Sequence, residues 1–438
     1  MRKLITVLFL SLMLSVSAEG AVKSLSLNDA LSIALKKNFG YRIAEGRREI
    51  ARAQKTGAAG GLLPFVSTSL SYGWTQRGPS SSFTQGLIFI PGSNRTSSSA
   101  NYSLGLDIRQ EVFDGGASFS NLKSSIADEA ASRENFRSSR QGLIFNVKSN
   151  YFSVLLARKL LEVDGNALET SEEQLKVAQA RYDLGSAALS DLLKAKVDLA
   201  SAQSILISHR SDYQQLLANL NFLLGEDVND SLELTDDLAQ PEAPALGYEE
   251  ALMRAEKNHP DLLAAQKRVE AADWGLQAGR AGLYPSIGLS AGYGWNNRDF
   301  SRVTSLFDRD YQWRFGFSIS YNLFDRFSTY QTVKISRAQF SNAHQEYLQE
   351  KSRIALEVKR VFLNLTKSRQ NIELNRQKVE SAGEDLNIEQ EKYKLGAATI
   401  LDLQKSQDNH RQAQYQAVLA LYDYNVAVAG LKKSIGEE

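Results

Sequence analysis

The sequence predicts a mainly α-helical chain with a membrane β-barrel, built from a duplicated helix–strand–strand–helix–helix repeat. Three observations predict this fold class. The 438 residues contain two similar copies, each copy holds two strictly alternating segments, and long helical segments follow them. A chain of this length has room for two or three ordinary domains. The duplication indicates instead one architecture made from two similar halves.

The two copies keep a constant register over many residues. Tyr72-Gly73-Trp74 recurs as Tyr293-Gly294-Trp295, a shift of 221 positions, and Tyr182-Asp183-Leu184-Gly185 recurs as Tyr393-Lys394-Leu395-Gly396, a shift of 211. A fixed period of this kind indicates tandem duplication. The change in shift places about ten extra residues in a loop of the first copy, because insertions collect in exposed loops. We expect the first repeat at 19–226, an acidic connector with two prolines at 227–247, and the second repeat at 248–438.

The start of the chain has the pattern of a secretory signal peptide. Arg2 and Lys3 precede an apolar run from Leu4 to Val16, and Val16-Ser17-Ala18 is a small-residue cleavage pattern. The apolar run is too short to span a bilayer. We therefore expect a signal peptide at 1–18, with cleavage after Ala21 as the alternative.

The composition excludes several kinds of function. The absence of cysteine rules out disulfides, thiol nucleophiles and thiolate metal sites, and a net charge of +1 does not indicate a nucleic-acid partner. The four histidines lack metal-ligand spacing, and we expect them to be solvated helix residues, like the helical Asp and Glu. No nucleophile elbow, phosphate-binding loop or catalytic carboxylate pair is present. The sequence therefore predicts neither an enzyme nor a cofactor or metal site.

Four segments alternate strictly between apolar and polar residues, at about 65–76, 102–113, 285–296 and 311–324. Such alternation indicates a sheet with one apolar and one polar face, and a soluble antiparallel sheet would also show it. A membrane barrel is favoured because the strands run about 10–12 residues and carry aromatic residues on the apolar face near the loops. These aromatic residues are Tyr72, Trp74, Tyr293, Trp295, Tyr311 and Trp313. Four strands cannot close a membrane barrel, so two, three or four copies must share one.

The helical segments have matching lengths. The segment from Gly116 to Tyr182 is free of proline and would span roughly 100 Å as one helix. The segments before the strands (Ser26–Gly60) and after the turn (Leu189–Leu224) together have the same length, and the second copy repeats the arrangement. We therefore expect two half-length helices to stack end to end beside each full-length helix. Ser26 and Asp29 form a capping box for the first of them.

The order of these motifs resembles that of the TolC family of outer-membrane efflux proteins. The resemblance covers nearly the whole mature chain. It rests on Leu27-Asn28-Asp29-Ala30-Leu31, on the paired strand exits Phe113-Asp114-Gly115 and Phe324-Asp325-Arg326, and on the paired Tyr-x-Leu-Gly turns. The departures are Phe39, where the family usually has proline, and Ala398, where its best-studied member has an arginine that helps lock the tip.

The resemblance implies a homotrimer with a twelve-stranded barrel in outer-membrane lipid, on a long α-helical tunnel in the periplasm of a Gram-negative bacterium. It implies a periplasmic adaptor and an inner-membrane pump of the RND or ABC type. The function implied is passive export in a tripartite efflux or type I secretion system. The alternative is a coiled-coil-rich, adhesin-like surface protein, which does not explain the duplicated strands. The cargo and the type of pump are not predicted.

The resemblance also assigns roles to the helix-to-helix turns. It implies that the adaptor docks at Leu184, Gly185, Ser186, Leu395, Gly396 and Ala397. The simpler interpretation is that a glycine past a helix end adopts a left-handed conformation cheaply. The resemblance further implies a pore constriction formed by Asp191, Asp402, Tyr182 and Tyr393. Here the simpler interpretation is that the aspartates stabilise helix N-termini, with Thr399 and Asp402 as a capping box, and Lys194 and Lys405 partly neutralise them.

Overall fold

The computed structural model describes residues 23–79, 83–85, 88–90, 95–242 and 246–437, so the predicted signal peptide lies outside the described residues. The chain divides into two compact units. We call residues 48–132 and 265–347 the strand unit, and the remainder, 1–47, 133–264 and 348–438, the helix unit. Each unit is assembled from both halves of the sequence.

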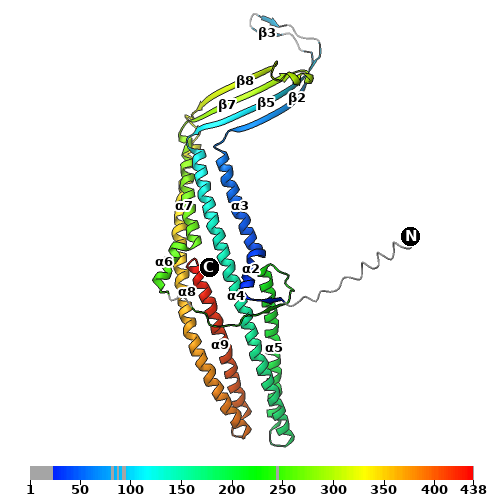
Figure 1. Cartoon of the computed structure of the whole chain (residues 1–438), viewed down its shortest axis with the longest axis vertical. Helices are drawn as coiled ribbons and strands as arrows, with labels where there is room; N and C mark the ends of the chain where they lie inside the picture. Colours follow the sequence, from blue (N-terminus) through cyan, green and yellow to red (C-terminus); the bar gives the residue numbers. More distant parts are fainter. Residues whose placement is uncertain (1–22, 80–82, 86–87, 91–94, 243–245, 438) are drawn as a thin grey trace, which may run out of the picture. The chain divides into compact units, whose positions relative to one another are not determined.

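The strand unit contains one four-stranded antiparallel sheet with the order β2-β5-β7-β8 (Figure 1). The strands are β2 (Phe65–Arg77), β5 (Ser97–Asp114), β7 (Ser286–Asn297) and β8 (Tyr311–Ser320). Strand β5 begins five residues before the predicted start because its first residues, from Ser97, pair with the end of β2. Strand β8 ends four residues before the predicted end. All four alternating segments therefore lie in a single sheet, which keeps one apolar face.

The loops at one end of this sheet differ between the two copies. The longer first-copy loop carries β3 (Phe83–Gln85) paired with β4 (Ile88–Ile90), and the second-copy loop carries the 3-10 helix η2 (Phe300–Ser305). The prediction of extra residues in the first loop agrees with this hairpin, part of which lies outside the described residues.

Two of the six aromatic residues expected on an exposed apolar face are buried. Tyr293 and Trp295 are 6% and 1% exposed, and residues that follow η2 cover Tyr293. The Tyr293 hydroxyl donates a hydrogen bond to the backbone oxygen of Leu306, and its ring stacks on Phe307 with centroids 5.5 Å apart. The other four aromatic residues, Tyr72, Trp74, Tyr311 and Trp313, are exposed as expected.

The helices largely follow the predicted lengths. Two helices of 67 residues, α4 (Ala117–Asp183) and α8 (Ser328–Lys394), are each followed by a returning helix, α5 (Leu189–Leu224) and α9 (Ile400–Ser434). The prediction of a single helix before each pair of strands is wrong. Residue Asn38 separates α2 (Leu27–Lys37) from α3 (Phe39–Gly60), and His259 separates α6 (Tyr248–Asn258) from α7 (Pro260–Gly279). Among the described residues, no helix is apolar enough along a sufficient length to cross a lipid bilayer.

The helices before the strands are interrupted at Asn38 and at His259. At each of these breaks, the end of a returning helix meets the interrupted helices. At the first break, the Asn38 side chain donates to the backbone oxygen of Leu223 at 2.8 Å, and Gly225 adopts a φ of 75° at the end of α5. A Cβ atom on Gly225 would lie 2.6 Å from the backbone oxygen of Lys37. At the second break, Gly436 ends α9 with a φ of 77° and approaches Asn258 equally closely. The expected end-to-end meeting of the half-length helices is confirmed at both points.

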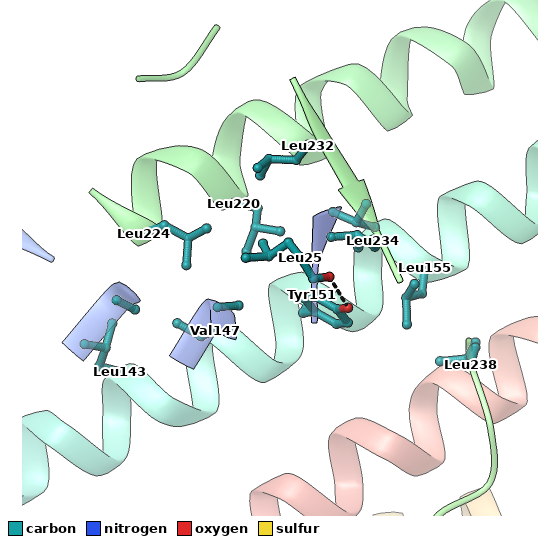
Figure 2. Close-up of a cluster of buried hydrophobic side chains, with 13 residues drawn as sticks. Leu25, Leu143, Val147, Tyr151, Leu155, Leu220, Leu224, Leu232, Leu234 and Leu238 are labelled. Atoms are coloured by element: carbon teal, nitrogen blue, oxygen red, sulfur yellow. Dashed lines mark hydrogen bonds between the residues drawn. The ribbon is translucent and has the colours of Figure 1, made fainter. Parts of the chain in front are cut away.

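The main core of the helix unit joins the start of the first repeat to the connector that follows it (Figure 2). Strand β1 (Lys23–Leu25) pairs in parallel with β6 (Leu232–Leu234), which lies in the connector. Leu25, Leu220 and Leu234 pack around Tyr151 of α4, whose hydroxyl donates to the backbone oxygen of Leu25 at 2.9 Å. The connector is therefore part of the folded core.

The expectation that the histidines and the helical carboxylates are solvated is wrong for several of them. His259 and Asp164 are buried, and His209 is hydrogen-bonded to Asp164. His259 is 4% exposed and accepts a hydrogen bond from the Asp261 backbone N–H through Nδ1 at 3.3 Å. That contact requires an unprotonated Nδ1, and His259 therefore ends α6 as a neutral imidazole.

The buried imidazole predicts a pH dependence of stability. Burial lowers the pKa of His259 below its usual value, despite the opposing influence of Asp261 and Glu357. The unfolded chain then binds the proton more readily, so stability is present above about pH 6.5 and is lost as the pH falls below it. We expect His259→Gln to weaken this acid destabilisation relative to the unaltered protein. Thermal unfolding followed over a pH series would measure it, and an identical acid sensitivity in the variant would contradict it.

Candidate functional site: the tips of the helix pairs

The two helix pairs, α4–α5 and α8–α9, end in turns of the same geometry. Gly185 and Gly396 follow the long helices with φ values of 70° and 76°. In the first turn the Gly185 N–H donates to the Tyr182 oxygen at 2.9 Å, and the Ser186 N–H donates to the Arg181 oxygen at 2.8 Å. The second turn repeats both bonds from Gly396 and Ala397. This is the Schellman arrangement, which satisfies the last carbonyls of a helix and requires a left-handed residue.

The turn places one large apolar side chain of each pair in water. Leu184 and Leu395 are 82% and 83% exposed. An exposed leucine on a turn contributes no burial energy in a free chain, because apolar surface adds stability only when it is covered. Each tip therefore offers an apolar contact point on a rigid turn.

The two tips contact each other through Tyr393. The Arg181 guanidinium lies 5.1 Å from the centre of the Tyr393 ring and donates to the Tyr393 backbone oxygen at 3.4 Å. Tyr393 also packs beside the buried cluster of Ala178, Ala195 and Ile400, which joins both helix pairs. Tyr182 is not part of this cluster, and its side chain is exposed. Arg181, which directly precedes Tyr182 in the sequence, was not among the predicted constriction residues.

The two candidate constriction aspartates have different surroundings. Asp402 closes a capping box: its carboxylate accepts from the Thr399 N–H at 3.1 Å, and its own N–H donates to the Thr399 hydroxyl at 3.2 Å. Asp191 has no such partner, because Ala188 occupies the N-cap of α5 and makes no side-chain cap bond. The nearest cation to Asp191 is Lys194, at 3.8 Å. The simpler interpretation thus accounts for the contacts of Asp402 and for the contact of Asp191 with Lys194, although Asp191 is not part of a capping box.

The cap also affects the charge of Asp402. Hydrogen bonds from the Thr399 side chain and backbone lower the pKa of Asp402, with smaller contributions from Lys405 and Lys392. Asp402 therefore stays ionised over the whole neutral range. A groove of about 330 Å³ runs between α5 and α9 beyond their first turns, lined by Lys194, Asp198 and Asp408 among others. Neither Asp191 nor Asp402 lines this groove.

This combination of one apolar-faced sheet, two long helix pairs and two matched tips defines a class of protein: the outer-membrane export channels. The chain belongs to the outer membrane efflux protein family, whose model matches residues 30–226 and 251–437. It is a channel of the Gram-negative outer membrane that extends into the periplasm. The membership favours the export channel over the adhesin-like alternative, and the members of the family are channel proteins.

Individual relatives agree with this membership. The chain is 24% identical over 437 residues to the alkaline protease secretion protein AprF of Pseudomonas aeruginosa, covering 99% of this chain and 88% of AprF. It is 24% identical over 334 residues to the outer membrane efflux protein BepC of Brucella suis, covering 76% and 72% of the two chains. The Campylobacter jejuni CmeC outer membrane channel has the same fold, with a TM-score of 0.83 at 18% identity over 94% of this chain and 85% of CmeC. The predicted fold class is thereby confirmed.

Proposed function

We propose that three copies of this chain form the outer-membrane duct of a tripartite efflux or type I secretion system. An inner-membrane pump, of the RND or ABC type, delivers cargo through a periplasmic adaptor, and the duct releases it passively. The observation that carries this proposal is the pair of rigid tips, each with an exposed leucine. The relatives include both a protease secretion protein and an efflux protein. We therefore propose that the pump, and not the duct, selects the class of cargo.

An open groove on the α8–α9 pair supports the homotrimer. Its volume is about 850 Å³, and Asn375 and Ala420 line it. In the duplicated register, these two residues correspond to Asp164 and His209, which α9 of the same chain covers through Tyr415. The counterpart of Tyr415 is Ser204 on α5. By this internal symmetry, α5 of a second copy covers the groove, and three chains with four strands each close a twelve-stranded barrel.

The mass of the detergent-solubilised protein tests the homotrimer. We expect three chains per particle, because the sheet of one chain leaves β2 and β8 with open edges that lipid cannot hydrate. A monomer that is stable in detergent and conducts ions in a bilayer would contradict the proposal.

We propose that the adaptor docks on Leu184, Gly185 and Ser186 of one tip and on Leu395, Gly396 and Ala397 of the other. Replacing both Leu184 and Leu395 with aspartate should abolish export by cells, since a charge at each contact point must be desolvated on docking. The same variant should keep its conductance in planar bilayers. The matched control replaces both leucines with methionine, which keeps the apolar surface and should preserve export. Normal export by the aspartate variant would place the docking surface elsewhere.

We also propose that Asp191, Asp402, Tyr182 and Tyr393 surround the narrowest part of the duct. The contact of Arg181 with Tyr393 supports a closed tip, because it joins the two helix pairs at their ends. The carboxylate of Asp191, which is not engaged in a capping box, supports a role in ion selectivity.

The division of the chain completes the proposal: a signal peptide at 1–18, repeats at 19–226 and 248–438, and a connector at 227–247. Sequencing the N-terminus of the exported protein tests the first boundary. We expect Glu19 as the first residue. A mature chain that begins at Val22 would support the alternative cleavage after Ala21.

A further inference from the structure

A buried carboxylate joins three helices well above the tips. The side chain of Asp164, on α4, is 1% exposed. One of its oxygens accepts a hydrogen bond from the hydroxyl of Tyr415 on α9, and the other contacts Nδ1 of His209 on α5. Because a carboxylate only accepts, His209 donates through Nδ1. The two rings also meet edge to face, with centroids 5.8 Å apart. Both oxygens of Asp164 therefore accept hydrogen bonds. The oxygen that accepts from Tyr415 links α4 to α9, which belongs to the other helix pair.

A second contact of the same kind lies further from the tips. The hydroxyls of Ser153 on α4 and Tyr422 on α9 are 3.2 Å apart. Tyr415 and Tyr422 are seven residues apart, and Ser153 and Asp164 are eleven apart, so each pair lies on one face of its helix. One face of α9 is thus fastened to one face of α4 at two levels.

The bond between Tyr415 and Asp164 is well protected. Burial and the hydrogen bond to Asp164 raise the pKa of Tyr415, so its hydroxyl stays protonated and remains a donor. A hydrogen bond to a buried charge is stronger than one between neutral groups, and removing its partner leaves the charge unsatisfied. At the level of Asp164, the contact between the two pairs therefore depends on one phenolic hydroxyl.

The second copy lacks this cluster. The residues in the corresponding positions are Asn375, Ala420 and Ser204, which include neither a carboxylate nor an aromatic ring. If the duplicated helices served only to build a tunnel, they would not need this difference between the two copies. The cluster therefore strengthens the contact between the two helix pairs within one chain, and it does not strengthen the contact between chains.

We propose that Asp164, Tyr415 and His209 form a latch that holds α9 against α4 and α5 and so keeps the duct closed. The latch rests on the proposed function, since it acts on the opening of that duct. Tyr415 is fifteen residues from the start of α9, or about 20 Å up the helix. The helices are rigid over that distance, so separating the tips requires α9 to turn away from α4, and the Tyr415 bond must break first. The tip contact of Arg181 and the latch then resist opening at two different heights.

Single-channel recording of the purified protein in planar bilayers tests the latch. Tyr415→Phe removes only the hydroxyl and keeps the ring beside His209. Breaking a buried hydrogen bond to a charged group should raise the ratio of open to closed states by about tenfold to a hundredfold. Asp164→Asn, which keeps the shape of the side chain, should change the ratio in the same direction.

The control is a bond of the same type inside one pair. Ser171 on α4 is buried and donates to Asp198 on α5 at 2.8 Å, so Ser171→Ala breaks a carboxylate contact without releasing α9. We expect it to leave the open fraction unchanged. Equal opening in Tyr415→Phe and Ser171→Ala, or no opening in either latch variant, would overturn the latch. Thermal unfolding of each variant must stay close to that of the unaltered protein, and an opening that only accompanies unfolding would also overturn it. An unaltered protein that forms no channels at all would instead contradict the proposed function.

Discussion

Replacing Gly115 with alanine should prevent the chain from assembling in the outer membrane, whereas the same replacement at Gly116 should be tolerated. Gly115 lies between β5 and α4 with a φ of 69°, and a Cβ atom there would lie 2.3 Å from the backbone oxygen of Ala281. The clash is with main chain, so no side-chain rotation relieves it. Gly116 has a φ of 86°, but a Cβ atom there would meet nothing within 4 Å.

The comparison separates steric exclusion from backbone strain. An alanine at a left-handed position costs about 1–2 kcal/mol, and Gly116→Ala should lose about that much stability. Gly115→Ala carries the same strain and in addition must push the end of β5 away from the segment that enters β7. The amount of heat-modifiable protein in isolated outer membranes would measure both. Normal assembly of Gly115→Ala would show that Ala281 moves aside freely.

The second copy makes the same turn from strand to long helix with other residues. Arg326 and Phe327 correspond to the two glycines and have φ values of 55° and 64°. Both exits use an aspartate: Asp114 accepts from the Ser118 N–H and Asp325 from the Thr329 N–H, each at 2.7 Å. The duplication has therefore kept the backbone conformation and the cap but not the glycines. A glycine is required only where main chain approaches closely.

The features that the sequence predicted are those with a strong local signal. Alternation over ten or more residues predicted the strands of the sheet, and the Leu-Gly pairs predicted the left-handed turns at Gly185 and Gly396. The capping box of Ser26 and Asp29 and that of Thr399 and Asp402 are confirmed because each needs only four consecutive residues. The end of α6 was not predicted, although Pro260 follows His259.

The features that were missed depend on partners far apart in the sequence. Strands β1 and β6 are three residues long, and their pairing joins Leu25 to Leu234 across the whole first repeat. No periodicity forms in so short a segment. Asp164 looked like one more charge on a long helix, because its burial comes from α5 and α9. The covering of Tyr293 by Leu306 and Phe307 likewise depends on a loop conformation that alternation does not encode.

Neutralising the tip aspartates should reduce the preference of the channel for cations, and Asp191 should contribute more than Asp402. In a trimer the two positions supply six carboxylates. Those of Asp402 are turned toward Thr399 by the capping box, whereas those of Asp191 accept a hydrogen bond from the Ser190 hydroxyl at 3.4 Å and lie 3.8 Å from Lys194. A ring of like charges in a narrow passage raises the local concentration of counter-ions. We expect Asp191→Asn to lower the ratio of cation to anion permeability by roughly tenfold.

Reversal potentials in a potassium chloride gradient measure this ratio directly. Asp402→Asn provides the matched comparison, because it removes an equal charge and also weakens the cap of α9. If Asp402 acts mainly as a cap, its variant should lose thermal stability while keeping most of its selectivity. The Asp191 effect should shrink as salt is raised, since the screening length falls from about 10 Å at 0.1 M to about 3 Å at 1 M. If both variants keep the selectivity of the unaltered protein at low salt, these aspartates only stabilise helix N-termini. The constriction then lies elsewhere in the duct.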